Sequence, residues 1–152
     1  MSEECEQGKG TPTAGSDRRG LRGEAATSPA SHQGPLAART KAFALEIVRL
    51  YGQLPRSTVA QVLGRQLLRS GTSVGAQYRE ATRARSPAEF VSKVESALQE
   101  LEETRYWLEL LSDAGVLTAG ALAEATAESG ELTAMLVSSA RTAKERRRQG
   151  AT

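Results

Sequence analysis

From residue 36 onward, the sequence shows one pattern four times: a stripe of apolar residues at helical spacing, bounded by residues that start or stop a helix. Large apolar residues recur every three or four positions, as from Phe43 to Ile47, which is typical of one face of an α-helix. Helix-breaking residues at Pro55, Pro87 and Gly115 leave only short connections. Connections of this length exclude crossovers, so the pattern predicts an all-α fold, an up-down-up-down antiparallel four-helix bundle.

Helix-start signals set the expected boundaries. Ser86 has the position of an N-cap, followed by Pro87 at the first helical position and Glu89 at the third. The second helix is expected to start near Ser57 or Thr58, and Thr58 and Gln61 have the spacing of a capping box. Thr118 is expected to start the last helix. The expected helices, within a bundle domain over 36–149, span about 36–53, 58–83, 87–114 and 118–147.

Two features of the second segment, 58–83, bear on packing. Its large apolar residues, among them Val59, Val62 and Leu67, predict a single buried face. Gly71 and Gly75 lie four residues apart inside the same segment. Glycine costs roughly 1 kcal/mol against alanine in a helix, so we expect a neighbouring backbone to approach closely at these two positions.

Residues 1–35 differ from the rest of the chain. They are rich in Gly, Ser, Thr, Pro and Ala, and Leu21 is their only leucine. Such a segment buries too little apolar surface to offset the entropy of ordering, so we expect a disordered N-terminal tail. It contains no apolar stretch of the kind that a secretory signal needs, and no run in the chain is long enough to span a membrane. A cytoplasmic location without membrane association is the expectation.

Several kinds of catalytic site are excluded from the bundle by residue type. Cys5 and His32 are the only cysteine and histidine, and both lie in the expected tail. Glu100 and Glu103 lie three apart, but no core histidine completes the set of ligands that bundle di-metal sites use. We therefore expect no enzyme activity, no metal and no cofactor.

The net charge is only +2, but the charges are segregated. The second segment and the turn after it are rich in arginine, whereas the third, 87–114, is rich in glutamate. Antiparallel pairing of these neighbours is expected to place Arg69 opposite Glu100 and Glu103, and Arg65 opposite Arg105. We favour ion pairs that fix the helix register over a functional site, each exposed pair contributing about 0–1 kcal/mol.

A second basic cluster lies at the end of the chain, from Arg141 to Arg148. Its cations could complement the dipole at a helix C-terminus, or form a patch that binds phosphate, and the sequence does not separate the two. The candidate nucleic-acid-binding residues are therefore Arg65, Arg69, Arg79, Arg83, Arg85, Arg141, Lys144, Arg146, Arg147 and Arg148. Aromatic residues at Tyr78, Tyr106 and Trp107 are expected in the core or at an interface rather than in a ligand pocket.

Two stretches of sequence carry a family resemblance, one over 71–93 and one over 100–115. Together they resemble the bacterial four-helix bundle proteins that include the 23S rRNA intervening sequence proteins. Gln77 stands where that family usually has asparagine, and Arg105 where it usually has an apolar residue. The motif positions in this chain are Ser73, Gln77, Tyr78, Glu80, Ser86, Phe90, Glu100, Glu103, Tyr106 and Trp107.

The resemblance implies a homo-oligomer, typically a ring of five copies. A similar protein, the accessory variability determinant of diversity-generating retroelements, binds nucleic acid through a basic barrel. On this basis we expect a non-enzymatic oligomeric bundle that acts as a nucleic-acid-associated scaffold or accessory protein, with RNA or DNA as a partner. The alternative is a protein–protein interaction module that binds a partner protein and no nucleic acid.

Overall fold

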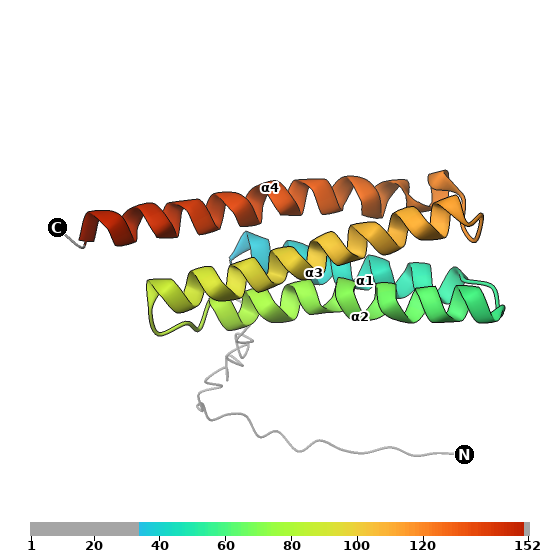
Figure 1. The fold of residues 1–152 in the computed structure, drawn as a ribbon, viewed down its shortest axis with the longest axis horizontal. Coiled ribbons are helices and arrows are strands. Elements are labelled where there is room, and N and C mark those ends of the chain that lie inside the picture. The colour runs from blue at the N-terminus through green and yellow to red at the C-terminus, as the bar shows by residue number, and fades with distance from the viewer. Residues whose placement is uncertain (1–33, 151–152) are drawn as a thin grey trace, which may run out of the picture.

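The computed structural model describes residues 34–150, and every regular element in this part of the chain is an α-helix (Figure 1). The helices are α1 (Pro35–Gln53), α2 (Thr58–Ala81), α3 (Pro87–Asp113) and α4 (Ala119–Gly150). Each packs against the next along the chain, and α1 also packs against α4, whereas the diagonal pairs are not neighbours. The predicted up-down-up-down four-helix bundle is confirmed. The predicted disordered tail, 1–35, lies outside the described residues except for its last two.

The local start and stop signals act largely as predicted. Ser86 Oγ accepts a hydrogen bond from the Glu89 main-chain nitrogen at 3.1 Å, and Thr118 Oγ1 accepts one from Ala121 at 3.1 Å. Gly115 has a φ of +67°, the left-handed conformation in which glycine is favoured just after a helix. The helix ends differ from the predicted ones by a few residues, since α2 stops at Ala81 rather than 83 and α4 continues to Gly150.

The start of α2 differs from the expected capping box. Ser57, not Thr58, is the N-cap, and its side chain accepts a hydrogen bond from Ala60. The Gln61 side chain instead donates to the Pro55 carbonyl oxygen at 3.0 Å and lies 3.2 Å from the Tyr51 hydroxyl. Of the two expected starts, Ser57 is therefore the one observed, and the capping box between Thr58 and Gln61 is not formed.

Close packing of α1 on α2 occurs at the predicted glycines. A Cβ atom on Gly71 would lie 2.7 Å from Ile47 Cγ1, and one on Gly75 would lie 3.3 Å from Thr40 Oγ1. Both distances are shorter than ordinary contacts between non-bonded heavy atoms. The absence of side chains at Gly71 and Gly75 therefore sets how closely the two helices approach.

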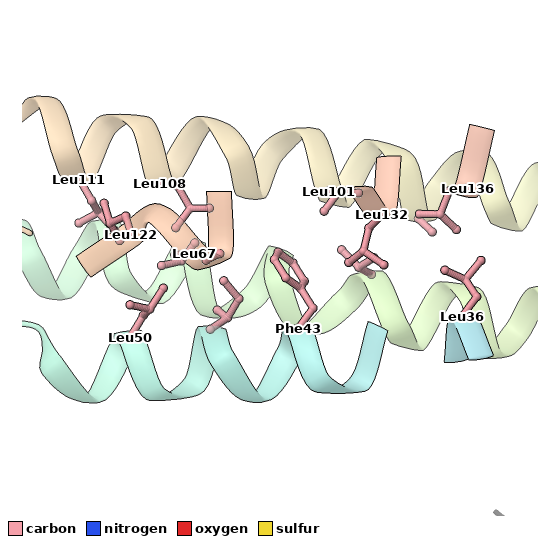
Figure 2. Close-up of a cluster of buried hydrophobic side chains, with 14 of the residues drawn as sticks. Leu36, Phe43, Leu50, Leu67, Leu101, Leu108, Leu111, Leu122, Leu132 and Leu136 are labelled. Atoms are coloured by element: carbon pink, nitrogen blue, oxygen red, sulfur yellow. The ribbon is translucent and has the colours of Figure 1, made fainter. Parts of the chain in front are cut away.

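The core runs along the axis of the bundle and is built from leucines of all four helices, with Phe43 among the largest buried side chains (Figure 2). On α2, the buried stripe consists partly of small residues such as Ala60 and Gly64. Val59 and Val62, expected in the core, are exposed. The helical period that buries Ala60, Gly64 and Leu67 turns these two valines outward. Among residues 34–150, no helix is both long and apolar enough to cross a membrane.

Candidate functional site

Eight of the ten predicted basic residues lie in two groups at the same end of the bundle. Three of them lie in the last turn of α2 and the turn that follows, and five lie on the last turns of α4 (Figure 1). Two clusters about 60 positions apart in the sequence thus lie at the same end of the bundle. We call this surface the basic end; its residues are Arg79, Arg83, Arg85, Arg141, Lys144, Arg146, Arg147 and Arg148, all of them exposed.

Most of these cations have no carboxylate partner. Lys144 Nζ lies 2.6 Å from Glu95 Oε1, but within the described chain no arginine of the basic end forms an ion pair. The nearby Glu80 pairs with Lys93, and Glu89 accepts a hydrogen bond from the main chain of Arg85. The guanidinium groups are therefore free to bind an anion. Arginine favours phosphate because its donors can bind two oxygens at once.

A groove opens at the basic end, between the start of α3 and the last turns of α4. It has a volume of about 450 Å³, and its apolar wall is formed by Pro87 and Phe90. The polar lining consists of the hydroxyl-bearing Ser138, Ser139 and Thr142, together with Arg146. Hydroxyl and guanidinium donors of this kind are suited to phosphate oxygens. The sequence analysis missed the three hydroxyl residues, because serine and threonine on a helix surface give no distinctive signal.

The groove continues into a second hollow of about 510 Å³ near the start of α1. Ser138 and Ser139 line both, and the second is also bounded by Pro35, Tyr78 and the carboxylate of Glu131. Partial burial raises the pKa of the Tyr78 phenol, so this group remains neutral around pH 7. The start of α1 at Pro35 forms one edge of this hollow.

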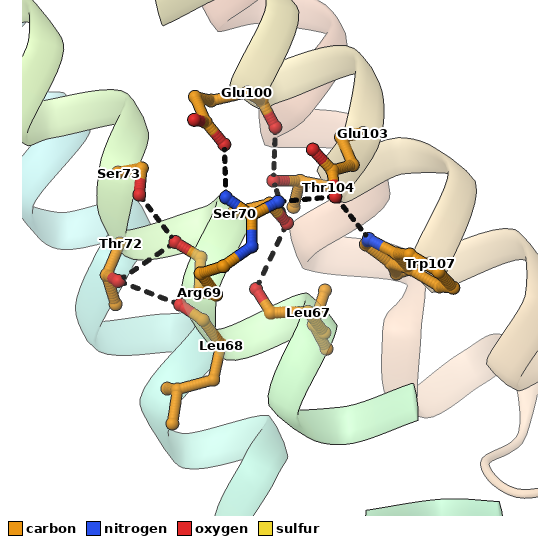
Figure 3. A network of polar contacts seen from close by, with 10 residues as sticks. All are labelled: Leu67, Leu68, Arg69, Ser70, Thr72, Ser73, Glu100, Glu103, Thr104 and Trp107. Atoms are coloured by element: carbon orange, nitrogen blue, oxygen red, sulfur yellow. Dashed lines mark hydrogen bonds and ion pairs between the residues drawn. The ribbon is translucent and has the colours of Figure 1, made fainter. Parts of the chain in front are cut away.

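Arg69 is held away from the basic end by a network between α2 and α3 (Figure 3). Its guanidinium lies 3.2 Å from Glu100 Oε2 and also hydrogen-bonds Glu103. The indole Nε1 of Trp107 donates to Glu103 at 3.2 Å. Beside this network, the buried hydroxyls of Ser70 and Thr104 lie 2.9 Å apart. The predicted position of Arg69 opposite the two glutamates is confirmed, and the network joins α2 to α3.

The network shifts the proton affinities of its members. The hydrogen bond from Arg69 lowers the pKa of Glu103, against a smaller opposing effect of burial, and the hydrogen bond from Trp107 lowers it further. The hydrogen bond to Glu103 likewise raises the pKa of Arg69. Both shifts favour the ionised pair, as expected when opposite charges share hydrogen bonds.

Arg69→Gln is expected to reduce stability at pH 7 by up to about 1 kcal/mol, because the side chain is half exposed. Since folding lowers the pKa of Glu103, this stabilisation is complete above the unfolded-state pKa of about 4.3 and is lost as pH falls through the folded-state value. Urea unfolding at pH 7 and pH 3 would measure it, and the difference between variant and wild type should shrink at pH 3.

Arg105→Gln is the matched control for this measurement. Arg105 pairs with Glu102 at 3.3 Å within one helix, and the Glu102 carboxylate is largely exposed. The control should change stability by less than about 0.5 kcal/mol at either pH. An Arg69→Gln effect of equal size at pH 7 and pH 3 would contradict the assigned ion pairs.

Arg65 has a different setting from the other candidates. It is exposed on the half of α2 away from the basic end and forms no ion pair in the described part of the chain. Its predicted neighbour Arg105 bonds Glu102 of its own helix instead. The structure therefore places Arg65, like Arg69, outside the basic end.

The family-motif positions have mainly structural surroundings. Ser73 Oγ donates to the Arg69 carbonyl oxygen at 2.7 Å, Ser86 caps α3, and Phe90 packs against the core. Trp107 is partly buried against the core, whereas Tyr106 is exposed and meets the Trp107 ring edge-on, with centroids 5.0 Å apart. The aromatic residues thus include both a packing residue and an exposed one.

Gln77 stands out among the motif positions. Its side-chain oxygen Oε1 is buried and has no hydrogen-bond partner among the described residues. A buried acceptor without a partner costs about 1–3 kcal/mol, unless a water molecule satisfies it. Gln77 is also the position at which the resemblance expects the shorter asparagine. The Oε1 atom of the longer glutamine side chain finds no hydrogen-bond partner there among the described residues.

The described part of the chain contains no group of three His, Cys, Asp or Glu residues placed to hold a metal ion. The carboxylates of Glu100 and Glu103 both pair with Arg69 of the neighbouring helix. Their arrangement is that of an ion-pair network.

Comparisons with known proteins agree with the geometry. The family model described as 23S rRNA-intervening sequence protein matches residues 36–138. Among solved structures, the chain is similar to a protein with unknown function from the S23 ribosomal protein family of Bacteroides thetaiotaomicron. The identity is 40%, the TM-score is 0.64, and the match covers 68% of this chain and 95% of the other. No curated protein matches the chain.

Proposed function

The chain belongs to the 23S rRNA-intervening sequence protein family, and from this we propose that it is a non-enzymatic, cytoplasmic bundle protein that self-assembles and associates with RNA or DNA. The basic end is the surface that contacts the nucleic acid. The family description refers to 23S rRNA, which agrees with a nucleic-acid partner but assigns no activity. The protein then serves as a scaffold or accessory factor.

The unpaired arginines of the basic end are the observation that carries this proposal. Carboxylates elsewhere on the bundle neutralise Arg39, Arg69 and Arg105, whereas the arginines at 146–148 have no such partner in the described chain. An unpaired cluster creates the positive potential that attracts a phosphate backbone. The groove beside Arg146 adds hydroxyl donors and the Phe90 side chain. Contacts of this type bind phosphates and do not by themselves read a sequence.

Replacing Arg146 and Arg147 together by glutamine should weaken binding to a short single-stranded RNA at least tenfold at physiological salt. Each lost phosphate contact on a single strand reduces the slope of log K against log salt by about 0.7, so the double variant should lose about 1.4. Fluorescence anisotropy over a salt series measures both quantities.

Arg56→Gln combined with Arg65→Gln is the matched control, since it removes the same charge from exposed positions outside the basic end. It should leave the salt slope nearly unchanged. An equal loss in the two double variants would place the interface elsewhere. Wild-type protein that ignores RNA at low salt would overturn nucleic-acid association and favour the protein-interaction alternative.

Self-assembly has its own measurement. Light scattering should give a mass that is a whole multiple of the 16.2 kDa chain, five times that value for the expected pentamer. The mass should not depend on RNA if the bundle assembles by itself. A mass of one chain at all concentrations would overturn this part of the proposal.

A further inference from the structure

The outward face of α1 has the composition of a buried helix face. Leu45 and Val48 are 55% and 48% exposed, although they are large and apolar. With Lys41 and Gly52 they recur at intervals of four and three residues, so these side chains form one stripe along the helix. We call these four residues, with Arg49 beside them, the α1 stripe. It contains only apolar, small and basic residues.

A groove of about 690 Å³ lies between α3 and α4, on a different side of the bundle. Buried Leu108 and Leu122 line it, and the small side chains of α4, such as Ala123, form one wall. The carboxylate-bearing residues of its lining are Glu102, Glu109 and Asp113, against the single cation Arg105. We call this the α3/α4 groove. Small residues on one wall allow a further helix to approach closely.

We infer that the α3/α4 groove of one copy receives the α1 stripe of a second copy. Leu45 and Val48 fit the apolar interior of the groove, where burial removes their surface from water. Lys41 lies on the basic side of the contact, together with Arg49, which also pairs with Glu46 of its own helix. Glu102, Glu109 and Asp113 lie on the acidic side. Such charge complementarity fixes the register of the two copies and disfavours other pairings.

The two surfaces cannot meet within one chain, because α1 packs against α2 and α4 but not against α3. A contact between two different surfaces is heterologous, so each bound copy offers a free stripe and a free groove to further copies. Repetition therefore leads to a closed ring or an open filament. This inference rests on the proposed self-assembly and specifies its interface.

Another exposed apolar pair, Val59 and Val62, lies on α2 and offers an alternative surface. The trapping experiment compares this surface directly with the α1 stripe. Val62 is about as exposed as Leu45 and therefore supplies a matched control.

Disulfide trapping between two single-cysteine proteins tests the contact directly. In a Cys5→Ser background, Leu45→Cys protein is mixed with Ala123→Cys protein and oxidised gently. The expected product is a heterodimer joined between these positions, and the same experiment with Val62→Cys should give at least tenfold less. Equal yields from Leu45→Cys and Val62→Cys would overturn the inference.

Charge reversal provides a second, independent test by light scattering. Lys41→Glu with Arg49→Glu should convert the assembly to single chains, with an unchanged helical circular dichroism spectrum. Adding Glu102→Lys and Glu109→Lys to the same chain should restore assembly. If the reversed-charge protein keeps the wild-type mass, this interface is overturned but the proposed self-assembly is not. If the wild-type protein has the mass of one chain, both are overturned. RNA binding is measured separately and is not affected by either result.

Discussion

Phe43→Ala is expected to lower the free energy of unfolding by about 3–5 kcal/mol, the largest single-residue effect in the bundle. Phe43 lies on α1, is 2% exposed and packs among leucines of the core (Figure 2). Alanine removes the ring and leaves a cavity that neighbouring helices fill only in part. Because a small domain is stable by only about 5–15 kcal/mol, a large part of the population would unfold at moderate urea concentrations.

Leu45→Ala on the same helix is the control for this prediction. Leu45 is 55% exposed, so alanine should change the unfolding free energy by about 0.5 kcal/mol or less. Urea titrations monitored by circular dichroism would compare the variants. They should be recorded at low protein concentration, because assembly stabilises the folded state by mass action. Equal losses in the two variants would contradict the assignment of Phe43 to the core.

Gly71→Val is expected to destabilise the bundle by about 3 kcal/mol through overpacking. The new Cβ would lie 2.7 Å and 2.9 Å from the two Cγ atoms of Ile47, which is itself fully buried. Ile47 cannot move away without disturbing the core, so α1 and α2 must separate. The small gain in helix propensity over glycine, a few tenths of a kcal/mol, does not offset this strain.

Gly130→Val makes the same chemical change on α4, where no atom lies within 4 Å of the new Cβ. The substitution should therefore be neutral or slightly stabilising. The change in thermal midpoint measures both variants, and Gly71→Val should lower it by 10 °C or more, at about 4–8 °C per kcal/mol for a small domain. A Gly71→Val midpoint equal to that of Gly130→Val would mean that the two helices are less closely packed than the structure shows.

The sequence predicts those features of the fold that depend on local signals and on antiparallel pairing. Ser86 and Gly115 identify helix ends from their own residue types, and the register of α2 on α3 follows from the short turn between them. That register correctly places Arg69 opposite Glu100 and Glu103. Local chemistry and chain connectivity are sufficient for these features.

Other features depend on packing that hydrophobicity alone does not encode. Val59 and Val62 resemble core residues, yet the smaller Ala60 and Gly64 occupy the buried stripe because the neighbouring α1 needs the space. The groove beside Arg146 depends on how the start of α3 lies against the last turns of α4, and the sequence pattern of either helix does not contain this information. Tertiary contacts settle both points.

The unequal lengths of α1 and α4, 19 and 32 residues, have a consequence for local stability. The last buried side chain of α4 is Ala140, so the ten residues that follow are held to the bundle by surface contacts, such as that of Lys144 with Glu95, and not by core packing. An isolated helix of that length is marginal in water. Amide hydrogens from 141 to 150 should thus exchange with solvent far faster than those between 122 and 140. An anion bound to the closely spaced arginines would neutralise their charge and relieve their mutual repulsion. Amide exchange in this segment should therefore become slower when an anion is bound.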